Sequence, residues 1–278
     1  MRTVKIVADS SADMLERLGI DFGVAPLKIN TDDRDFVDDA TLDVHGMVTW
    51  FDTYKGKSKT SCPNSGEWLE AFADAEEVFC VTITSGLSGS YNSACAAGRL
   101  YEEQYPGRRV HVVDSLSAGP ELVLIIEKLE EYIRQGLPFE EIREQIEAYK
   151  ATTGLVFMLA SLKNFAANGR ISPALAKIVG VLGIRIVGIA SREGTLEPIH
   201  KPRGEAKALK SIFDHLVDSG LQQGKVWIAH CENPTAADTL AGMLREALPQ
   251  VTVQIHPCRG LCSYYAEKHG MLVGFEKF

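Results

Sequence analysis

The sequence predicts an α/β protein with a mostly parallel sheet and flanking helices in its amino-terminal half. Short β-rich runs alternate there with helical patterns, and this alternation is typical of a parallel sheet covered by helices. Polar turns follow three of the extended runs, at residues 9–11, 84–90 and 114–117, and ligands of such sheets bind at the carboxyl ends of the strands. Beyond residue 155 the chain becomes richer in Gly, Ile and Val, which indicates a second domain with an α/β or α+β fold.

The chain length supports this division. At about 150 residues per domain, 278 residues make one large or two medium domains, and we predict domains at 1–155 and 156–278. We expect Ser65 to cap one helix and the polar residues 9–11 to cap another. The expected elements, in order, are a strand at 4–9, a helix at 14–18, a strand at 23–30, a helix at 66–75, a strand at 77–84, a helix at 91–105, a strand at 108–115, helices at 120–136 and 138–152, a hairpin at 192–198, a helix within 201–220, a strand at 225–231, a helix at 233–248, and strands at 251–256 and 270–278.

Composition argues against several classes of partner. The net charge is −8 and no cluster of Lys and Arg interleaves with aromatic residues, so nucleic acid is not an expected partner. No run approaches the ~20 uninterrupted apolar residues of a transmembrane segment, since the most apolar stretch contains Arg185 and several glycines. The chain begins with a strand pattern rather than the apolar core of a signal peptide, and we expect a cytoplasmic protein.

Cysteine and histidine, the residue types that most often bind transition metals, are scattered along the chain. The six cysteines, at positions 62, 80, 95, 231, 258 and 262, show no C-x-x-C spacing, and the histidines at 200, 230, 256 and 269 form no H-x-x-x-H pair. The acidic stretch 31–39 lacks the glycine and glutamate spacing of an EF-hand, so we interpret it as a solvated loop. We therefore predict no metal site and reduced, mostly buried thiols.

The serine-rich stretch 84–90 is the first candidate site. It lies between a predicted strand and a predicted helix, where hydroxyls and backbone N–H groups at a helix start can bind an anion. The order Gly86-Leu87-Ser88-Gly89-Ser90 also approaches the G-x-S-x-G pattern of a nucleophile elbow, but a serine occupies the final glycine position. A capped helix, an anion site and a nucleophile at Ser88 therefore all remain open from the residues alone.

Two further clusters carry hydroxyl or basic groups. Thr60 and Ser61 precede a proline turn, where their hydroxyls either face a ligand or close the turn locally. Arg170 stands before a Ser-Pro pair typical of a helix start, and it is either a solvated charge or an anion clamp.

In combination, these clusters resemble the DegV family of bacterial fatty-acid-binding proteins. The matching stretches are VADSSADM (7–14), VAPLKI (24–29), TSCPNSGEW (60–68), ITSGLSGSYNSA (83–94), VVDS (112–115), LKNFAANGRIS (162–172), IRIVGIASREG (184–194) and KPRGEAKAL (201–209). The resemblance implies a two-domain protein that has no catalytic role and no cofactor. It implies that a long-chain fatty acid, such as palmitate, lies in an apolar tunnel between the domains and is presented to a separate fatty acid kinase.

The resemblance also implies roles for individual residues. Thr60 and Ser61 match one family turn that holds the carboxylate, and Ser85, Ser88 and Gly89 match a second turn. We expect the Ser88 hydroxyl to be the principal donor, because it lies nearest the predicted helix start.

Two arginines match positions toward the mouth of the site. Arg170 corresponds to the arginine of a Gly-Gly-Arg-Ile-Ser motif, which implies a contact with the ligand. With Arg203, it is also expected to face the kinase partner or the forming phosphate.

Three positions depart from the family pattern. Cys62 stands where glutamine is usual, and Asn168 replaces the first glycine of the Gly-Gly-Arg motif. The family's carboxy-terminal histidine, which helps to hold the carboxylate, has no counterpart here, because the aligned position falls at or near Ala266. Tyr264 and Tyr265 are candidate phenol donors in its place.

Physical chemistry agrees with a lipid ligand. Burying about 14 methylenes at ~0.8 kcal/mol each contributes ~11 kcal/mol before ordering costs, so a few hydroxyls need only orient the head group. Two alternatives to a non-enzymatic carrier are a serine hydrolase or small-anion enzyme using Ser88, and an adaptor that binds another ligand in the cleft. One apolar run is suited either to the hydrophobic core or to the wall of a ligand tunnel. It comprises Ile178, Val179, Val181, Leu182, Ile184, Ile186 and Val187.

Overall fold

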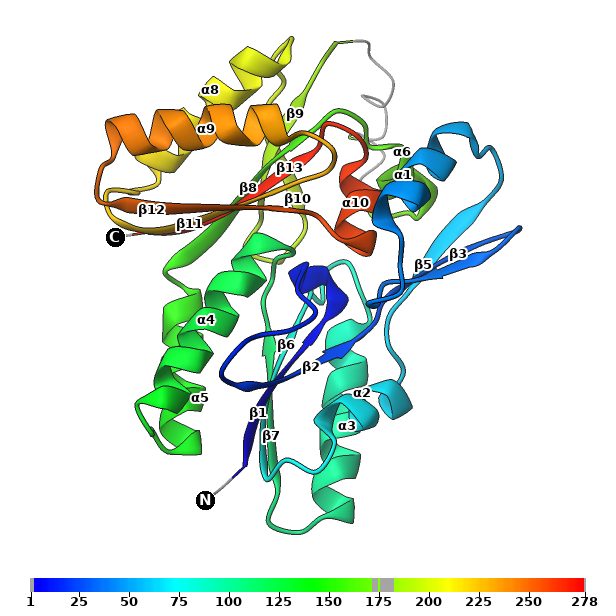
Figure 1. Cartoon of the computed structure of the whole chain (residues 1–278), viewed down its shortest axis with the longest axis vertical. Helices are drawn as coiled ribbons and strands as arrows, with labels where there is room; N and C mark the ends of the chain where they lie inside the picture. Colours follow the sequence, from blue (N-terminus) through cyan, green and yellow to red (C-terminus); the bar gives the residue numbers. More distant parts are fainter. Residues whose placement is uncertain (1–2, 172–174, 176–182, 278) are drawn as a thin grey trace.

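Three β-sheets organise the chain in a computed structural model, which describes residues 3–171, 175 and 183–277 (Figure 1). A four-stranded parallel sheet occupies the lower part of the view, and a six-stranded sheet occupies the upper part. A small three-stranded antiparallel sheet projects to one side. This architecture confirms the predicted α/β class, with a parallel sheet and flanking helices in the amino-terminal half.

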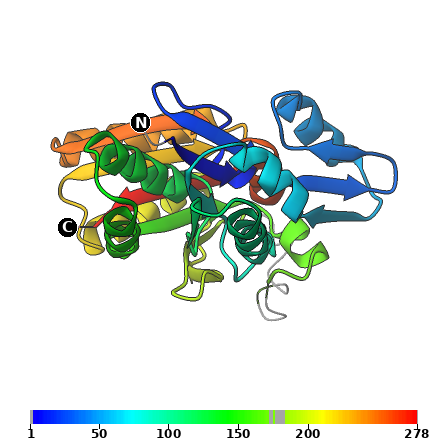
Figure 2. The same cartoon turned by 90° about the horizontal axis from the view of Figure 1, so that it is seen from below.

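The parallel sheet has the strand order β2-β1-β6-β7, and all of its pairs are parallel. Its strands are β1 (Val4–Asp9), β2 (Asp21–Ala25), β6 (Glu77–Thr82) and β7 (Arg109–Asp114). The helices α2 (Ser65–Phe72) and α3 (Ser90–Gln104) cover one face, and α4 (Pro120–Arg134) and α5 (Phe139–Lys150) lie on the other (Figure 2). Every residue of β6 is buried, as expected for a central strand between two helical layers.

The six-stranded sheet is mostly antiparallel, in the order β10-β9-β8-β13-β11-β12. Its strands are β8 (Thr153–Leu159), β9 (Ile186–Ala190), β10 (Leu196–His200), β11 (Gly224–His230), β12 (Val251–Pro257) and β13 (Met271–Glu276). The helices α8 (Glu205–Asp218) and α9 (Pro234–Ala247) pack on one face, whereas α4 contacts β13 and β11 on the other. Helix α4 therefore lies between the two large sheets, because it also packs against β6 and β1.

The three-stranded sheet has the order β4-β3-β5 and carries the helix α1 (Val44–Thr53). Its strands are β3 (Lys28–Thr31), β4 (Asp35–Val37) and β5 (Ser58–Ser61). Two short helices connect it to the rest of the molecule: α6 (Lys163–Ala167) lies beside β5, and α10 (Gly260–Ala266) packs against α1.

Several expectations for individual elements were wrong. Residues 14–18 do not form a helix. The residues just before them form a short 3₁₀ helix instead, η1 (Ser10–Ala12), which ends at Asp13 with a left-handed φ of 56°. Asn64, rather than Ser65, caps α2, because its side chain and that of Glu67 form a reciprocal capping box. The acidic stretch 31–39 is not one loop, since β4 forms within it and pairs with β3.

The predicted boundary between residues 155 and 156 falls inside β8, which pairs with β13 and β9 along its length. The division of the chain into domains stays a prediction. No helix in the part of the chain that the structure describes is long and apolar enough to cross a membrane.

Candidate functional site

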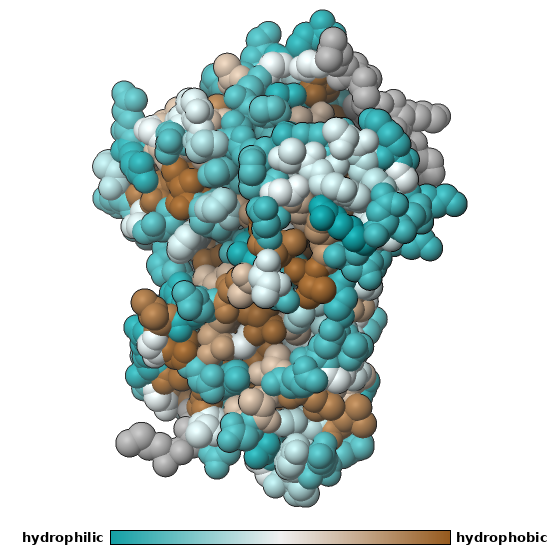
Figure 3. Space-filling model, turned by 45° about the vertical axis from the view of Figure 1, so that its right-hand side comes forward, coloured by the Kyte–Doolittle hydropathy of each residue, from teal (hydrophilic) through white to brown (hydrophobic). Residues whose placement is uncertain are grey.

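A cavity of about 280 Å³ lies where the loops of the parallel sheet meet the six-stranded sheet. On one side of the molecule, apolar side chains gather in a hollow between the upper and lower parts (Figure 3). Most of the cavity wall is apolar and comes from segments far apart in the sequence: Leu27, Ile83, Leu87, Ala118, Leu155, Phe157, Leu159, Phe165, Ala190, Leu196, Leu261, Ala266 and Leu272.

The cavity wall also contains polar residues, and several of them lie on segments that contact one another. Thr60 and Ser61 at the end of β5 line the cavity together with Ser88 and Gly89, and the hydroxyl of the exposed Ser61 donates to the Asn30 side chain at 3.1 Å. A Cβ built on Gly89 would lie 3.3 Å from the Sγ atom of Cys62, so the two turns are in direct contact. The structure therefore brings together at one cavity five of the six predicted ligand-binding residues: Thr60, Ser61, Ser88, Gly89 and Arg170.

The turn between β6 and α3 is shaped by its own hydroxyls. The Oγ atom of Ser88 accepts a hydrogen bond from the backbone N–H of Ser90 at 3.2 Å, which closes a serine turn just before α3. Thr84 Oγ1 accepts from Gly86 N–H and donates to the carbonyl of Gly194 at 2.9 Å, which joins the turn to the β9–β10 connection. Gly86 has no room for a side chain, because a Cβ there would lie 2.5 Å from the carbonyl oxygen of Glu193.

A buried carboxylate at the end of β1 supports this turn from behind. Asp9 is fully buried and accepts hydrogen bonds from Ile83 N–H at 2.9 Å and from the Ser90 hydroxyl at 2.6 Å. Its other oxygen accepts from the N–H and the hydroxyl of Ser11. Burial raises the pKa of Asp9, and these four donors oppose that rise.

Arg170 also forms a hydrogen bond with the turn between β6 and α3. Its Nε–H donates to the carbonyl oxygen of Leu87 at 2.8 Å, and its guanidinium lies 5.9 Å from the ring centroid of Tyr265. A second nitrogen donates to the carbonyl of Asn168 at 3.1 Å. The side chain is half-buried, so the cation lies at the cavity and is not a solvated surface charge.

The two tyrosines of α10 form hydrogen bonds with β5. Tyr265 lines the cavity, and its hydroxyl shares a 2.7 Å hydrogen bond with the Thr60 hydroxyl. Tyr264 bonds Ser58 in the same way and accepts from the Asn168 amide at 2.9 Å. Burial raises the pKa of Tyr265 to about 12, so its hydroxyl keeps its proton and can donate at neutral pH. Tyr264 itself does not line the cavity.

The departure at Asn168 has a structural role. Its side-chain oxygen accepts from the backbone N–H of Thr60 at 3.2 Å, while its amide donates to Tyr264. One side chain therefore satisfies an N–H of the edge strand β5 and fixes the tyrosine that packs beside it. A glycine at this position would provide neither bond.

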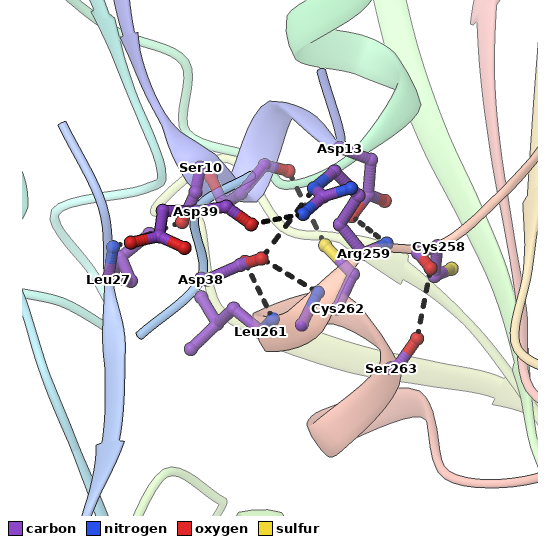
Figure 4. A network of polar contacts seen from close by, with 12 residues as sticks. Ser10, Asp13, Leu27, Asp38, Asp39, Cys258, Arg259, Leu261, Cys262 and Ser263 are labelled. Atoms are coloured by element: carbon purple, nitrogen blue, oxygen red, sulfur yellow. Dashed lines mark hydrogen bonds and ion pairs between the residues drawn. The ribbon is translucent and has the colours of Figure 1, made fainter. Parts of the chain in front are cut away.

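A network of polar contacts holds the amino-terminal end of α10 (Figure 4). Asp38 is fully buried and accepts from the backbone N–H groups of Gly260 and Leu261, each at 2.9 Å. Arg259 donates from its backbone to Asp13 at 2.7 Å and from its guanidinium to the Asp39 carbonyl at 2.6 Å. These contacts fix α10 against η1 and the three-stranded sheet, and so they position Tyr265 at the cavity.

The arrangement offers little support for a serine nucleophile. No histidine lines the cavity among the described residues, and the Ser88 hydroxyl already accepts a hydrogen bond within its own turn. Burial raises the pKa of the Cys62 thiol, so this cysteine is not an activated nucleophile either. Among the residues that the structure describes, no group of three His, Cys, Asp or Glu side chains could hold a metal ion.

Other predicted residues lie elsewhere. Ser85 is exposed and does not line the cavity; its N–H donates to Asp114 at 3.0 Å. Arg203 is exposed beside Ile184 and is also outside the cavity wall. Of the apolar run, Ile178, Val179, Val181 and Leu182 lie outside the described residues, Ile184 and Ile186 pack in the cluster that surrounds the cavity, and Val187 faces the helices α8 and α9.

Sequence reasoning placed Asp9 and Thr84 in polar turns at strand ends but assigned no role in the site to them or to the β9–β10 connection. Thr84, Asp9 and the β9–β10 connection shape the serine turn through contacts between residues far apart in the sequence. Asp9 and Thr84 do lie at the ends of neighbouring parallel strands, which was the available signal.

The fold and its cavity define a class of protein: an α/β protein that encloses a mostly apolar ligand site with a few convergent polar groups. The family model described as "Uncharacterised protein, DegV family" matches residues 3–276. The chain belongs to the DegV family.

Similar proteins include several of known structure. A DegV family protein from Eubacterium eligens loaded with heptadecanoic acid is 45% identical, with a TM-score of 0.96 over 99% of this chain and 100% of that one. The Streptococcus pneumoniae fatty acid kinase (Fak) B3 protein loaded with linoleic acid is 43% identical, with the same TM-score and coverage. A curated DegV domain-containing protein of Streptococcus pneumoniae is 43% identical over 278 residues, which is 99% of each chain.

Proposed function

We propose that this protein binds a long-chain fatty acid in the cavity and presents it to a separate fatty acid kinase. The observation that carries the proposal is the composition of one cavity: hydroxyls and an arginine contribute to a wall that is otherwise mostly apolar. Relatives with 43–45% identity over the whole chain have been solved with heptadecanoic and linoleic acid bound. An acyl chain gains from burial against the apolar wall, and the polar cluster replaces the water lost by the carboxylate.

In this proposal the Thr60, Ser61 and Ser88 hydroxyls donate to the carboxylate, and Arg170 supplies the nearby positive charge. Gly89 allows the ligand to approach the backbone at the start of α3. The Tyr265 phenol takes the place of the missing histidine of other family members by donating to the Thr60 hydroxyl, which leaves the Thr60 proton for the carboxylate. Its hydrogen bond with Thr60 links the two hydroxyls that face the ligand.

We propose that the protein itself performs no catalysis. A carrier needs a site that holds the carboxylate without attacking it, and neutral hydroxyls with an arginine meet that requirement. Arg203 is exposed outside the cavity, where it is available to a kinase. Presentation is tested by acyl-phosphate formation with a bacterial fatty acid kinase and ATP, in which Arg203→Ala lowers the rate without changing fatty-acid affinity.

The direct test of binding is to identify the lipid in the protein. Protein purified from bacteria is denatured and extracted, and the extract is analysed by mass spectrometry. We expect close to one long-chain fatty acid per chain, and the delipidated protein should rebind added palmitate. If no acyl chain is recovered and no added fatty acid binds, the proposal is wrong.

A further inference from the structure

An aromatic ring covers a glycine in the floor of the cavity. Phe157 in β8 and Gly188 in β9 are directly opposite one another in the six-stranded sheet. Phe157 lines the cavity and is 5% exposed. A Cβ built on Gly188 would lie 2.4 Å from the Cζ atom and 2.7 Å from the Cε2 atom of the ring. The tip of the ring therefore occupies the space that a side chain at position 188 would fill.

Backbone conformation does not account for the glycine. Gly188 is not among the glycines with a positive φ, and it lies inside a regular strand, where glycine weakens the pairing. Two close neighbours exclude a side chain, and the nearer is the Phe157 ring. The other near atom is the carbonyl oxygen of Glu197 in β10, at 2.7 Å from the built Cβ.

The alternation of side chains places this pair on the cavity side of the sheet. Leu155, Phe157 and Leu159 of β8 line the cavity, whereas the intervening residues of β8 face α8 and α9. On β9 the residues of the same face are Ile186, Gly188 and Ala190, and the one directly opposite Phe157 is the glycine. The ring leans across β9 because Gly188 leaves it room, and a side chain at position 188 would displace it.

The other aromatic residues of the cavity are held differently. Phe165 and Tyr265 pack on each other with ring centroids 4.6 Å apart, next to the polar cluster. Their positions depend on that mutual contact and on the Thr60 hydrogen bond. Phe157 instead leans over Gly188, so its tilt depends on the residue at position 188.

We propose that the Phe157–Gly188 pair determines which acyl chains the cavity accepts. With the ring leaning over Gly188, the cavity keeps the width that a long or cis-unsaturated chain requires. With the ring lifted, only shorter and straighter chains fit. This inference rests on the proposed fatty-acid binding, and it identifies the residues that set chain selectivity.

The test compares oleic acid with myristic acid on delipidated protein. In Gly188→Ala, we expect oleic acid to lose roughly tenfold or more in affinity relative to myristic acid, as for one methyl group forced into a tight apolar pocket. Adding Phe157→Leu to that variant should restore the ratio, because the shorter side chain no longer reaches the new methyl group. Gly242→Ala is the matched control, since a Cβ at that position in α9 meets nothing within 4 Å.

A second variant keeps the proposal testable if Gly188→Ala disturbs β10 through Glu197. Phe157→Trp enlarges the ring without changing β9, and it should lower the oleic-to-myristic ratio in the same direction. A ratio that moves less than about twofold in both variants overturns the inference while fatty-acid binding stands. If the unaltered protein binds neither acid, the proposed function fails instead, so the two failures are distinguishable.

Discussion

The two ends of α10 are held by different chemistry. At its amino-terminal end, buried acidic side chains accept hydrogen bonds: Asp38 accepts from two helix N–H groups, and Asp13 accepts from the N–H of Arg259. Toward its carboxy-terminal end, neutral hydroxyls pair with hydroxyls, with Tyr264 on Ser58 and Tyr265 on Thr60.

The difference teaches what each end does. A buried acidic side chain, charged or neutral, is costly to leave without hydrogen-bond partners, so the contacts of Asp38 and Asp13 are suited to fixing the helix permanently. Hydroxyls carry no charge, and they can exchange one partner for a ligand carboxylate at little cost. We therefore interpret the first end as an anchor and the second as part of the proposed binding site. The predictions below separate these two roles.

The largest expected effect is a loss of stability when the anchor is broken. Asp38→Ala removes both acceptors of the α10 N–H groups and leaves Arg259 beside an empty space. We expect the free energy of unfolding to fall by about 3 kcal/mol, in the range for removing one partner of a buried charged pair. Urea denaturation measures the change.

The control for the anchor is a substitution of an exposed acid on the same sheet. Asp35→Ala in β4 alters a charge that is exposed, and its effect should stay within about 0.5 kcal/mol. If the two variants are equally stable, α10 does not depend on Asp38.

A smaller effect, on ligand affinity rather than on stability, is expected at the hydroxyl end. The double variant Thr60→Ala with Ser88→Ala removes two proposed donors to the carboxylate. At a net contribution of about 1 kcal/mol for each hydroxyl, the loss of both donors should lower palmitate affinity by roughly thirtyfold. Isothermal titration of delipidated protein gives the value.

Two controls make this result specific. Ser85→Ala changes an exposed hydroxyl of the same turn that is outside the cavity wall, and it should leave affinity unchanged. Hexadecanol has no carboxylate, so its affinity should change less than that of palmitate in the double variant. Equal losses for the acid and the alcohol would contradict a carboxylate site at Thr60 and Ser88.

The sequence predicted which residues line the cavity better than which residues bond to one another there. Thr60, Ser88 and Arg170 stand in short motifs, so that each could be recognised from its neighbours, although their roles stay predictions. The bond between Thr60 and Tyr265 joins residues 205 positions apart, and no local pattern encodes such a pair. The 14–18 helix failed for a related reason, since the polar residues 9–11 are used in long-range contacts and in η1.

The anchor should also make stability depend on pH. Burial raises the pKa of Asp13 from 3.8 to about 8, with Asp38 adding repulsion and Arg259 opposing it. Between these values the folded protein retains a proton that the unfolded chain releases. The contribution is therefore present below about pH 4 and is lost as the pH rises toward 8, by at most ~1.4 kcal/mol per pH unit.

Asp13→Asn tests this assignment. The amide keeps an acceptor for the Arg259 N–H, resembles the protonated acid, and tolerates the left-handed φ of 56°. Urea midpoints across the window should fall less steeply with pH in the variant than in the unaltered protein. Identical slopes would assign the pH dependence to other buried acids, among which burial also raises the pKa of Asp9 and Asp38.

The smallest expected effect decides whether a phenol replaces the missing histidine. Tyr265→Phe removes one hydroxyl while keeping the ring that packs on Phe165, so stability and cavity shape should change little. If the phenol orients Thr60 toward the carboxylate, palmitate affinity should fall by about fivefold, as expected for one hydrogen bond of ~1 kcal/mol. Tyr264→Phe is the matched control, because Tyr264 bonds Ser58 outside the cavity wall. A loss of affinity in the Tyr264 variant alone would mean that α10 contributes packing to the site and no donor.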